Sequence, residues 1–150
     1  MGSEDTSRTA QFVNPTLVTA TGAIAMIHLD SSFLIRSLLP QTREAVQLEH
    51  WLNNRVPLGA SAVCWAEFLC GPFDVDQIPT LTLMLGVPVP FTDRDSARAA
   101  ELFNVGGRRR GTFVDCMIAA TAIGENAALA TTNLADFSRF QSSGLVLEEI

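Results

Sequence analysis

The sequence lacks long apolar runs and is poor in cysteine, and both absences narrow the class of protein. The longest apolar stretch, Val114–Ile123, is interrupted by two polar residues and falls short of the roughly 18 residues that a membrane-spanning helix needs. The three cysteines show no CxxC or Cys/His spacing, and their odd number argues against a disulfide framework. Residues 1–25 have no basic start followed by an apolar segment, so no secretory signal is expected. We therefore predict a soluble protein of the reducing cytoplasm, without membrane association.

Charged residues are also scarce. They make up 17% of the 150 residues, whereas hydrophobic residues make up 47%, which excludes a disordered or coiled-coil chain and predicts about one domain with a real core. The net charge is −6, although an enzyme that acts on nucleic acid usually presents a basic surface to phosphate. An acidic chain fits such an enzyme if several of its acids hold divalent cations, which reverse the local field.

Regular structure is predicted from Met26 onward. Residues 1–25 show no apolar periodicity and are expected to form a flexible extension ahead of a single domain over residues 26–150. The predicted strands are 25–29, 58–60, 87–90, 128–131 and 145–147, and the predicted helices are 32–39, 42–53, 61–69, 76–85, 92–103 and 112–124. This alternation predicts an α/β fold with a mainly parallel sheet covered by helices on both faces. Ligands of such sheets bind beyond the carboxyl ends of the strands.

Four acidic residues stand in unusual places for a charge. Asp30 directly follows an apolar strand, Glu67 lies in an apolar helical stretch, Asp115 interrupts the first turn of another apolar helix, and Asp136 follows a strand. Simpler roles exist for three of them: a helix N-cap for Asp30, interaction with the helix dipole for Asp115, and a turn for Asp136. Glu67 is different, because a half-buried carboxylate among aromatic side chains needs a partner.

Taken together, the four acids indicate a bound cation. Clustered carboxylates repel one another, and a divalent cation is the simplest compensation. For the same reason, a neutral substitution of Asp30 or Asp115 is expected to raise the stability of the metal-free protein or to leave it unchanged.

Four segments of the chain, in order and spacing, resemble the PIN-domain family. They are residues 26–35 (MIHLDSSFLI), 61–71 (SAVCWAEFLCG), 113–122 (FVDCMIAATA) and 131–137 (TTNLADF). Each motif is weak alone, but the ordered set is specific, and the resemblance covers residues 26–150. It implies a PIN-like, Rossmann-like three-layer fold with an acidic pocket that binds Mg²⁺ or Mn²⁺ and hydrolyses RNA.

The resemblance also assigns individual positions. Asp30, Glu67 and Asp115 match the three core acids of the family. The fourth acid is placed differently among its members, and here the alternatives are Asn133 and Asp136. Asp136 is favoured because it carries charge, with Asn133 as a neutral ligand or orienting group.

Hydroxyl groups flank these acids. Ser31 or Ser32 fits the hydroxyl that often follows the first Asp of the family, and Thr131 matches a threonine often found beside the site. Thr132 stands where the family often has Arg, so one phosphate contact is missing from this chain.

The chemistry follows from these positions. RNA hydrolysis needs a nucleophilic water, stabilisation of charge in the transition state and help for the leaving oxygen, all of which one or two divalent ions supply. We expect Asp30 and Asp115 to be the main metal ligands and Asp136 to complete a second, weaker site. Glu67 would orient or deprotonate the attacking water.

Other residues invite functional roles less strongly. Arg108, Arg109 and Arg110 form a Gly-flanked basic loop before Asp115, which offers a grip on the RNA backbone but is equally typical of a solvated loop. His28 lies within a strand pattern, where a packed histidine is the simpler interpretation. The two tryptophans are expected to fill the core.

Competing interpretations come from other classes of protein. A haloacid-dehalogenase-type phosphatase needs a second Asp where Ser32 stands, and a flavodoxin-like nucleotide binder needs a Gly-rich loop after its first strand; the chain has neither. A PIN-like module that binds RNA or protein without catalysis remains the alternative. Free-standing PIN proteins of this size resemble VapC-type toxins, which implies an RNA substrate, a VapB-type antitoxin partner and a homodimer.

Overall fold

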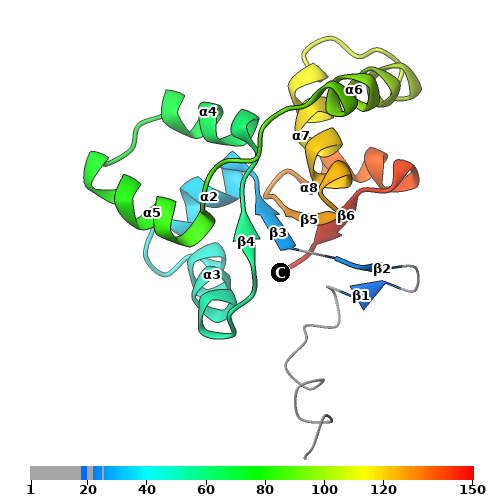
Figure 1. The fold of residues 1–150 in the computed structure, drawn as a ribbon. Helices are drawn as coiled ribbons and strands as arrows, with labels where there is room; N and C mark the ends of the chain where they lie inside the picture. Colours follow the sequence, from blue (N-terminus) through cyan, green and yellow to red (C-terminus); the bar gives the residue numbers. More distant parts are fainter. Residues whose placement is uncertain (1–17, 20–21, 25) are drawn as a thin grey trace, which may run out of the picture.

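The computed structural model describes residues 18–19, 22–24 and 26–150 (Figure 1). Its elements, with η for 3-10 helices, are β1 (Val18–Thr19), β2 (Gly22–Ala23), β3 (Met26–Leu29), α2 (Ser31–Ser37), α3 (Arg43–Asn53), β4 (Leu58–Gly59), α4 (Ala62–Cys70), η2 (Val75–Gln77), α5 (Ile78–Leu85), α6 (Asp93–Val105), α7 (Phe113–Gly124), β5 (Ala127–Ala130), α8 (Leu134–Phe137), η3 (Ser138–Ser143) and β6 (Val146–Glu148). The extension predicted over residues 1–25 falls largely outside the described residues. Within it, β1 and β2 pair as a short antiparallel ladder.

Parallel strands form the central sheet in the order β4-β3-β5-β6 (Figure 1). In the register, Ile27 of β3 pairs with Leu58 on one side and with Ala128 on the other. The chain leaves β3 toward β4 but leaves β5 toward β6, so the topological switch point lies between the carboxyl ends of β3 and β5. The predicted α/β fold with a parallel sheet is confirmed.

The helices cover both faces of the sheet because side chains alternate along its strands. Ile27 and Leu29 of β3 lie in one buried cluster with side chains of α2, α3, α4 and α5. Leu129 of β5 points to the other face, where it lies in a second cluster with side chains of α6, α7, α8 and η3. The result is a three-layer sandwich whose sheet is buried on both sides.

Local signals set where the helices begin. The Thr42 hydroxyl accepts the N–H of Ala45 at 3.0 Å, and the Ser61 hydroxyl accepts that of Cys64 at 3.1 Å. Thr92 forms a capping box with the third residue of α6. These side chains satisfy N–H groups that a helix leaves open at its start.

Two segments differ from the sequence prediction. Residues 87–90 do not form an edge strand; only Val89 bridges to the end of β4, donating to Ala60 and accepting from Ala62. The prolines on either side of Val89 have no N–H with which to extend the ladder. The short helices α8 and η3 were not predicted. Among the described residues, none of the helices has the length and apolar character needed to cross a membrane.

Candidate active site

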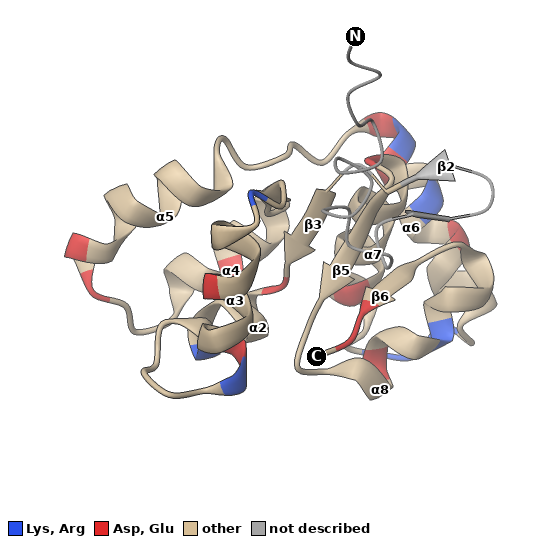
Figure 2. Ribbon diagram, turned by 90° about the horizontal axis from the view of Figure 1, so that it is seen from below, with Lys and Arg blue, Asp and Glu red and all other residues tan. Residues whose placement is uncertain are grey.

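The carboxyl edge of the sheet gathers the predicted acids. Asp30 and Thr131 follow β3 and β5, the two strands that flank the switch point. Glu67 lies on α4, while Asp115 and Asp136 lie in the first turns of α7 and α8. Figure 2 shows acidic segments directly after β3 and on α7 and α8, at the end toward which the strands point.

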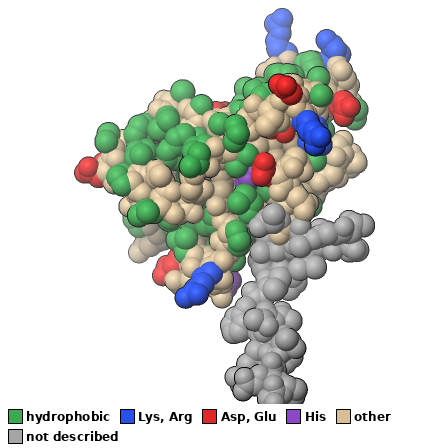
Figure 3. All heavy atoms as spheres, viewed as in Figure 1, with side chains coloured by type: hydrophobic (Ala, Val, Ile, Leu, Met, Phe, Trp, Pro, Cys, Tyr) green, Lys and Arg blue, Asp and Glu red, His purple; other side chains and the backbone are tan. Residues whose placement is uncertain are grey.

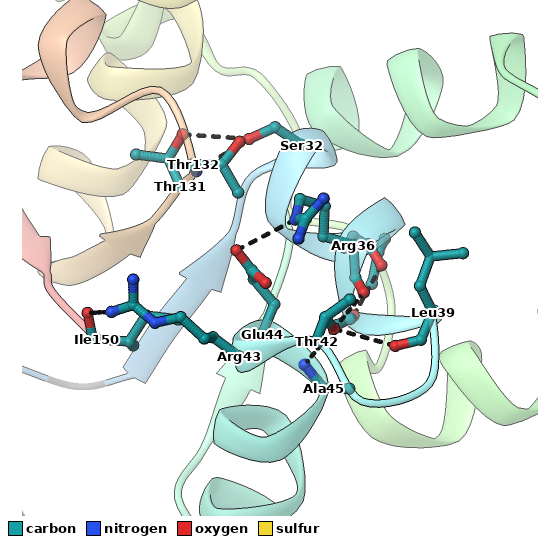
Figure 4. A network of polar contacts seen from close by, with 12 residues as sticks. Ser32, Arg36, Leu39, Thr42, Arg43, Glu44, Ala45, Thr131, Thr132 and Ile150 are labelled. Atoms are coloured by element: carbon teal, nitrogen blue, oxygen red, sulfur yellow. Dashed lines mark hydrogen bonds and ion pairs between the residues drawn. The ribbon is translucent and has the colours of Figure 1, made fainter.

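Asp30 is the most buried of these acids, with 3% of its surface exposed. Its Oδ2 accepts hydrogen bonds from the hydroxyls of Ser32 and Thr131, each at 2.8 Å. The Ser32 hydroxyl in turn accepts the backbone N–H of Thr132 at 3.2 Å and lies 3.3 Å from the Thr131 hydroxyl (Figure 4). Two segments far apart in sequence thus hold this carboxylate through hydrogen bonds.

The N-cap interpretation of Asp30 can be tested directly. The residue does occupy the N-cap position of α2 and has the extended backbone of a cap, but its side chain makes no capping hydrogen bond. Its oxygens accept instead from Ser32, Thr131 and the thiol of Cys64, the last at 3.5 Å. The side chain therefore does not cap α2 but meets hydroxyl and thiol groups of α2, of α4 and of the segment after β5.

Glu67 and Cys64 lie one helical turn apart on α4. Ligand atoms of Asp30, Cys64 and Glu67 all lie within 4.8 Å of one another. The Ser31 hydroxyl donates to Glu67 Oε1 at 3.3 Å. Burial and the negative charges of Asp30 and Asp115 raise the pKa of Glu67, while the Ser31 hydrogen bond opposes this rise. Burial and Asp30 also raise the pKa of the Cys64 thiol, which keeps it protonated.

Asp115 and Asp136 complete the acidic group through charge rather than through hydrogen bonds. Burial, then Asp136 and Asp30, raise the pKa of Asp115, and the Arg139 guanidinium opposes this. Asp136 therefore interacts electrostatically with Asp115. The backbone N–H of Asn133 donates to the Thr131 hydroxyl at 3.0 Å, so Asn133 helps to hold the group that orients Asp30.

Sequence reasoning missed two residues of this site, Cys64 and Arg139. Cys64 precedes Glu67 by three residues, a spacing that places both on one helix face. Arg139 follows Asp136 by three residues, and its Nη2 lies 4.0 Å from Asp115 Oδ2. Spacing from Glu67 was therefore a usable signal for Cys64, whereas the contact of Arg139 is with Asp115 of α7 and depends on tertiary packing.

The basic loop between α6 and α7 divides into two parts. The Arg108 guanidinium donates to Asn104 at 2.6 Å and lies 5.5 Å from the centre of the Phe103 ring, so it is held on α6. Arg109 and Arg110 are exposed, and Figure 3 shows basic side chains at the end of the molecule beside α6. The latter two remain free to meet a phosphate chain.

His28 does not belong to the pocket chemistry. It is 1% exposed, its Nε2 has no hydrogen-bond partner among the described residues, and burial lowers its pKa to about 4. It is thus a neutral, packed histidine. Trp51 is fully buried and stacks on Phe33 with ring centres 5.4 Å apart, while Trp65 packs at the edge of the core.

The donor set fits a hard divalent cation. Carboxylate oxygens are the ligands that Mg²⁺ and Mn²⁺ prefer. Burial, together with the charges of neighbouring acids, raises the pKa of Glu67 and of Asp115, and a bound cation would offset both effects. Asp30, Glu67, Asp115 and Asp136 are the residues that would hold such an ion.

Comparison with known proteins agrees with this arrangement. The family model of the PIN domain matches residues 27–142. No curated protein sequence matches the chain.

Solved structures with this fold include toxin–antitoxin proteins of the VapBC type. VapBC2 from Rickettsia felis, bound to a DNA fragment from its promoter, is similar with a TM-score of 0.65 and 23% identity over 82% of this chain and 97% of that one. VapBC-1 from nontypeable Haemophilus influenzae is similar with a TM-score of 0.64 and 23% identity, over 83% of this chain and 97% of that one. DNA-bound VapBC from Salmonella typhimurium is similar with a TM-score of 0.66 and 17% identity, over 82% of this chain and 96% of that one. At these identities the likeness establishes the fold.

Proposed function

The chain belongs to the PIN-domain family, and on that basis we propose that it is an endoribonuclease dependent on Mg²⁺ or Mn²⁺. One observation carries the proposal: a buried aspartate, fixed by hydroxyls from two elements, faces further carboxylates at the switch point of a parallel sheet. This is where ligands of α/β sheets bind. Carboxylates gathered there without a stable counter-ion are suited to metal-assisted phosphodiester hydrolysis.

Each residue has a proposed role. A bound divalent ion would supply a nucleophilic water at neutral pH and neutralise charge on the phosphate. Asp30 and Asp115 would be its principal ligands, and Asp136 would complete a second, weaker site. Glu67 would orient the attacking water and accept its proton, a task that its raised pKa favours.

The surrounding polar groups would orient these carboxylates and hold the substrate. Ser32 and Thr131 fix Asp30, and Ser31 steadies Glu67. Arg109 and Arg110, together with Arg108 where its position on α6 allows, would contact RNA phosphates. Sequence-independent grip by arginine is the usual basis of RNA backbone binding.

We further propose that the enzyme is a VapC-type toxin paired with a VapB-type antitoxin. Support comes from the structural neighbours, which include proteins of VapBC toxin–antitoxin systems. Exposed apolar side chains, including Leu83 at 88% and Val87 at 86%, lie on and beside α5. Figure 3 shows hydrophobic side chains gathered on the side of the molecule where α4 and α5 lie. Such a surface favours a protein partner or a homodimer. An Arg-bearing segment of the antitoxin would suit the carboxylate pocket.

Metal-dependent cleavage tests the proposal. The purified chain is expected to cleave single-stranded RNA with Mg²⁺ or Mn²⁺, to stop in EDTA and to recover when metal is restored. Cleavage that continues in chelator would exclude the metal mechanism. RNA binding without cleavage under every metal condition would favour the inactive binding module instead.

The toxin assignment needs a separate test in cells. Expression of the chain alone should arrest growth, and co-expression of a small DNA-binding protein encoded beside it should relieve the arrest. Harmless expression in a cell without any antitoxin, despite cleavage in vitro, would move the assignment to RNA processing.

A further inference from the structure

Among the described residues, Arg139 is the one positively charged side chain that forms an ion pair with the clustered acids. It lies on η3, and its Nη2 is 4.0 Å from Asp115 Oδ2. The adjacent Phe140, itself buried, holds the guanidinium over its ring at 4.5 Å from the ring centre. The fold therefore keeps a cation beside a carboxylate that is expected to bind metal.

The nitrogen atoms of Arg139 are unusually poor in partners. Nε and Nη2 are buried, yet neither has a hydrogen-bond partner among the described residues. At 4.0 Å the contact with Asp115 is an ion pair and not a hydrogen bond. Buried guanidinium N–H groups without partners are costly, and the aromatic stacking alone does not satisfy them. An ion pair of this length, without a hydrogen bond, is suited to being replaced when a divalent cation binds Asp115.

We propose that Arg139 is a positioning residue, which holds the Asp115 carboxylate in the metal-free pocket and competes with the divalent ion for it. The inference rests on the proposed function, because it concerns the same pocket. Arg139 acts through Asp115 and does not touch the substrate.

The proposal predicts the direction in which metal affinity changes when Arg139 is replaced. If Arg139 only supported local structure, its neutral replacement would weaken metal binding or leave it unchanged. If it is a competing counter-ion, its removal makes Asp115 fully available and metal binds more tightly. Because the effect passes through one carboxylate, it must disappear when Asp115 is neutral.

Direct Mn²⁺ binding, followed by electron paramagnetic resonance in the absence of RNA, provides the test. Arg139→Gln is expected to lower the Mn²⁺ Kd roughly threefold to tenfold at low ionic strength, with a smaller gain at high salt. Arg139→Lys, which keeps the charge, should stay close to the wild type. Arg36→Gln is the matched control, since Arg36 pairs with Glu44 at 3.3 Å outside the pocket (Figure 4), and its Kd should not change.

A double variant tests whether Arg139 affects metal affinity through Asp115. In an Asp115→Asn background, Arg139→Gln should bring no further gain in Mn²⁺ affinity. An unchanged or weaker affinity in the single variant overturns the proposal, and so does an equal gain in both backgrounds. If Arg139→Gln does not fold, Arg139→Met supplies a neutral side chain of similar length for the Phe140 ring. A wild-type protein that binds no Mn²⁺ at all would overturn the proposed function itself, a result distinct from the others.

Discussion

The two halves of the acidic pocket are built differently. On one side, Asp30 is 3% exposed and accepts hydrogen bonds from two hydroxyls and a thiol. On the other, the Asp115 side chain is 31% exposed and meets Asp136 and Arg139 through charge alone. Short hydrogen bonds from packed elements fix a geometry, whereas a long ion pair in partial contact with solvent does not. The Asp30 half is therefore preorganised, and the Asp115 half depends on which cation is present.

The largest effect is expected on catalysis, where both halves are needed. Asp30→Asn and Asp115→Asn should each lower RNA cleavage by more than about 100-fold, since loss of groups that merely orient metal ligands already costs 10- to 100-fold. Asp93→Asn, an exposed acid in the first turn of α6, is the control and should cleave normally. Initial rates on a fluorescent single-stranded RNA give the measurement. Substantial activity in either pocket variant would remove that half from the reaction.

A smaller effect separates the hydroxyls of the two neighbouring serines. Ser32→Ala removes a 2.8 Å hydrogen bond to buried Asp30, whereas Ser31→Ala removes only a 3.3 Å contact to exposed Glu67. We expect the first to slow cleavage roughly 10- to 100-fold and the second much less. Equal losses would mean that the hydrogen bond to buried Asp30 matters no more for cleavage than the contact to exposed Glu67.

The contrast between the two halves also shows which parts of the site could be predicted from the sequence. The strand-ending position of Asp30 predicted that its carboxylate lies at the carboxyl edge of the sheet, because the ends of adjacent parallel strands meet there. The hydroxyl groups beside it were expected only from the family resemblance. The Asp115 half was predicted only as a set of acids. Arg139 was missed because it lies on η3, a short helix without apolar periodicity, and its approach to α7 depends on tertiary packing. Residues 87–90 were assigned as a strand although only Val89 forms a bridge, because the prolines on either side of it have no N–H for a ladder.

Stability should respond in opposite directions in the two halves. Treated simply as one of several repelling charges, Asp30 would be expected to resemble Asp115. Its hydrogen bonds change that expectation: Asp30→Asn offers an amide where acceptors are needed and should lower the free energy of unfolding of the metal-free protein by about 1–3 kcal/mol. Asp115→Asn should raise it or leave it unchanged. Urea unfolding in EDTA measures both, and a comparable loss in Asp115→Asn would indicate that Asp115 has a capping role in α7.

The pH dependence gives a finer test of the Asp115 half. Burial, Asp136 and Asp30 raise the pKa of Asp115 in the folded protein. Its contribution to stability is therefore present below its ordinary pKa of about 4 and is lost as the pH rises through the raised value. The stability advantage of Asp115→Asn should grow over this range and become constant above it. A flat difference across a pH series of urea unfolding curves, with metal absent, would show that Asp115 is not destabilised by its neighbours.

The smallest effect is expected where contacts are fully screened by solvent, in the loop that leads from α6 to α7. Arg109 and Arg110 are exposed, whereas Arg108 is held by Asn104 and Phe103. Replacing the exposed pair with Ala should weaken RNA binding for all sequences alike and reduce the slope of log affinity against log salt by up to about 0.7 per lost phosphate contact. Arg108→Ala is the matched control and should change the slope less, since its guanidinium is already engaged. Fluorescence anisotropy with catalytically inactive Asp115→Asn protein over a salt series separates binding from cleavage. If the slope does not change in the double variant, Arg109 and Arg110 make no contact with RNA phosphates, and the loop is a solvated turn.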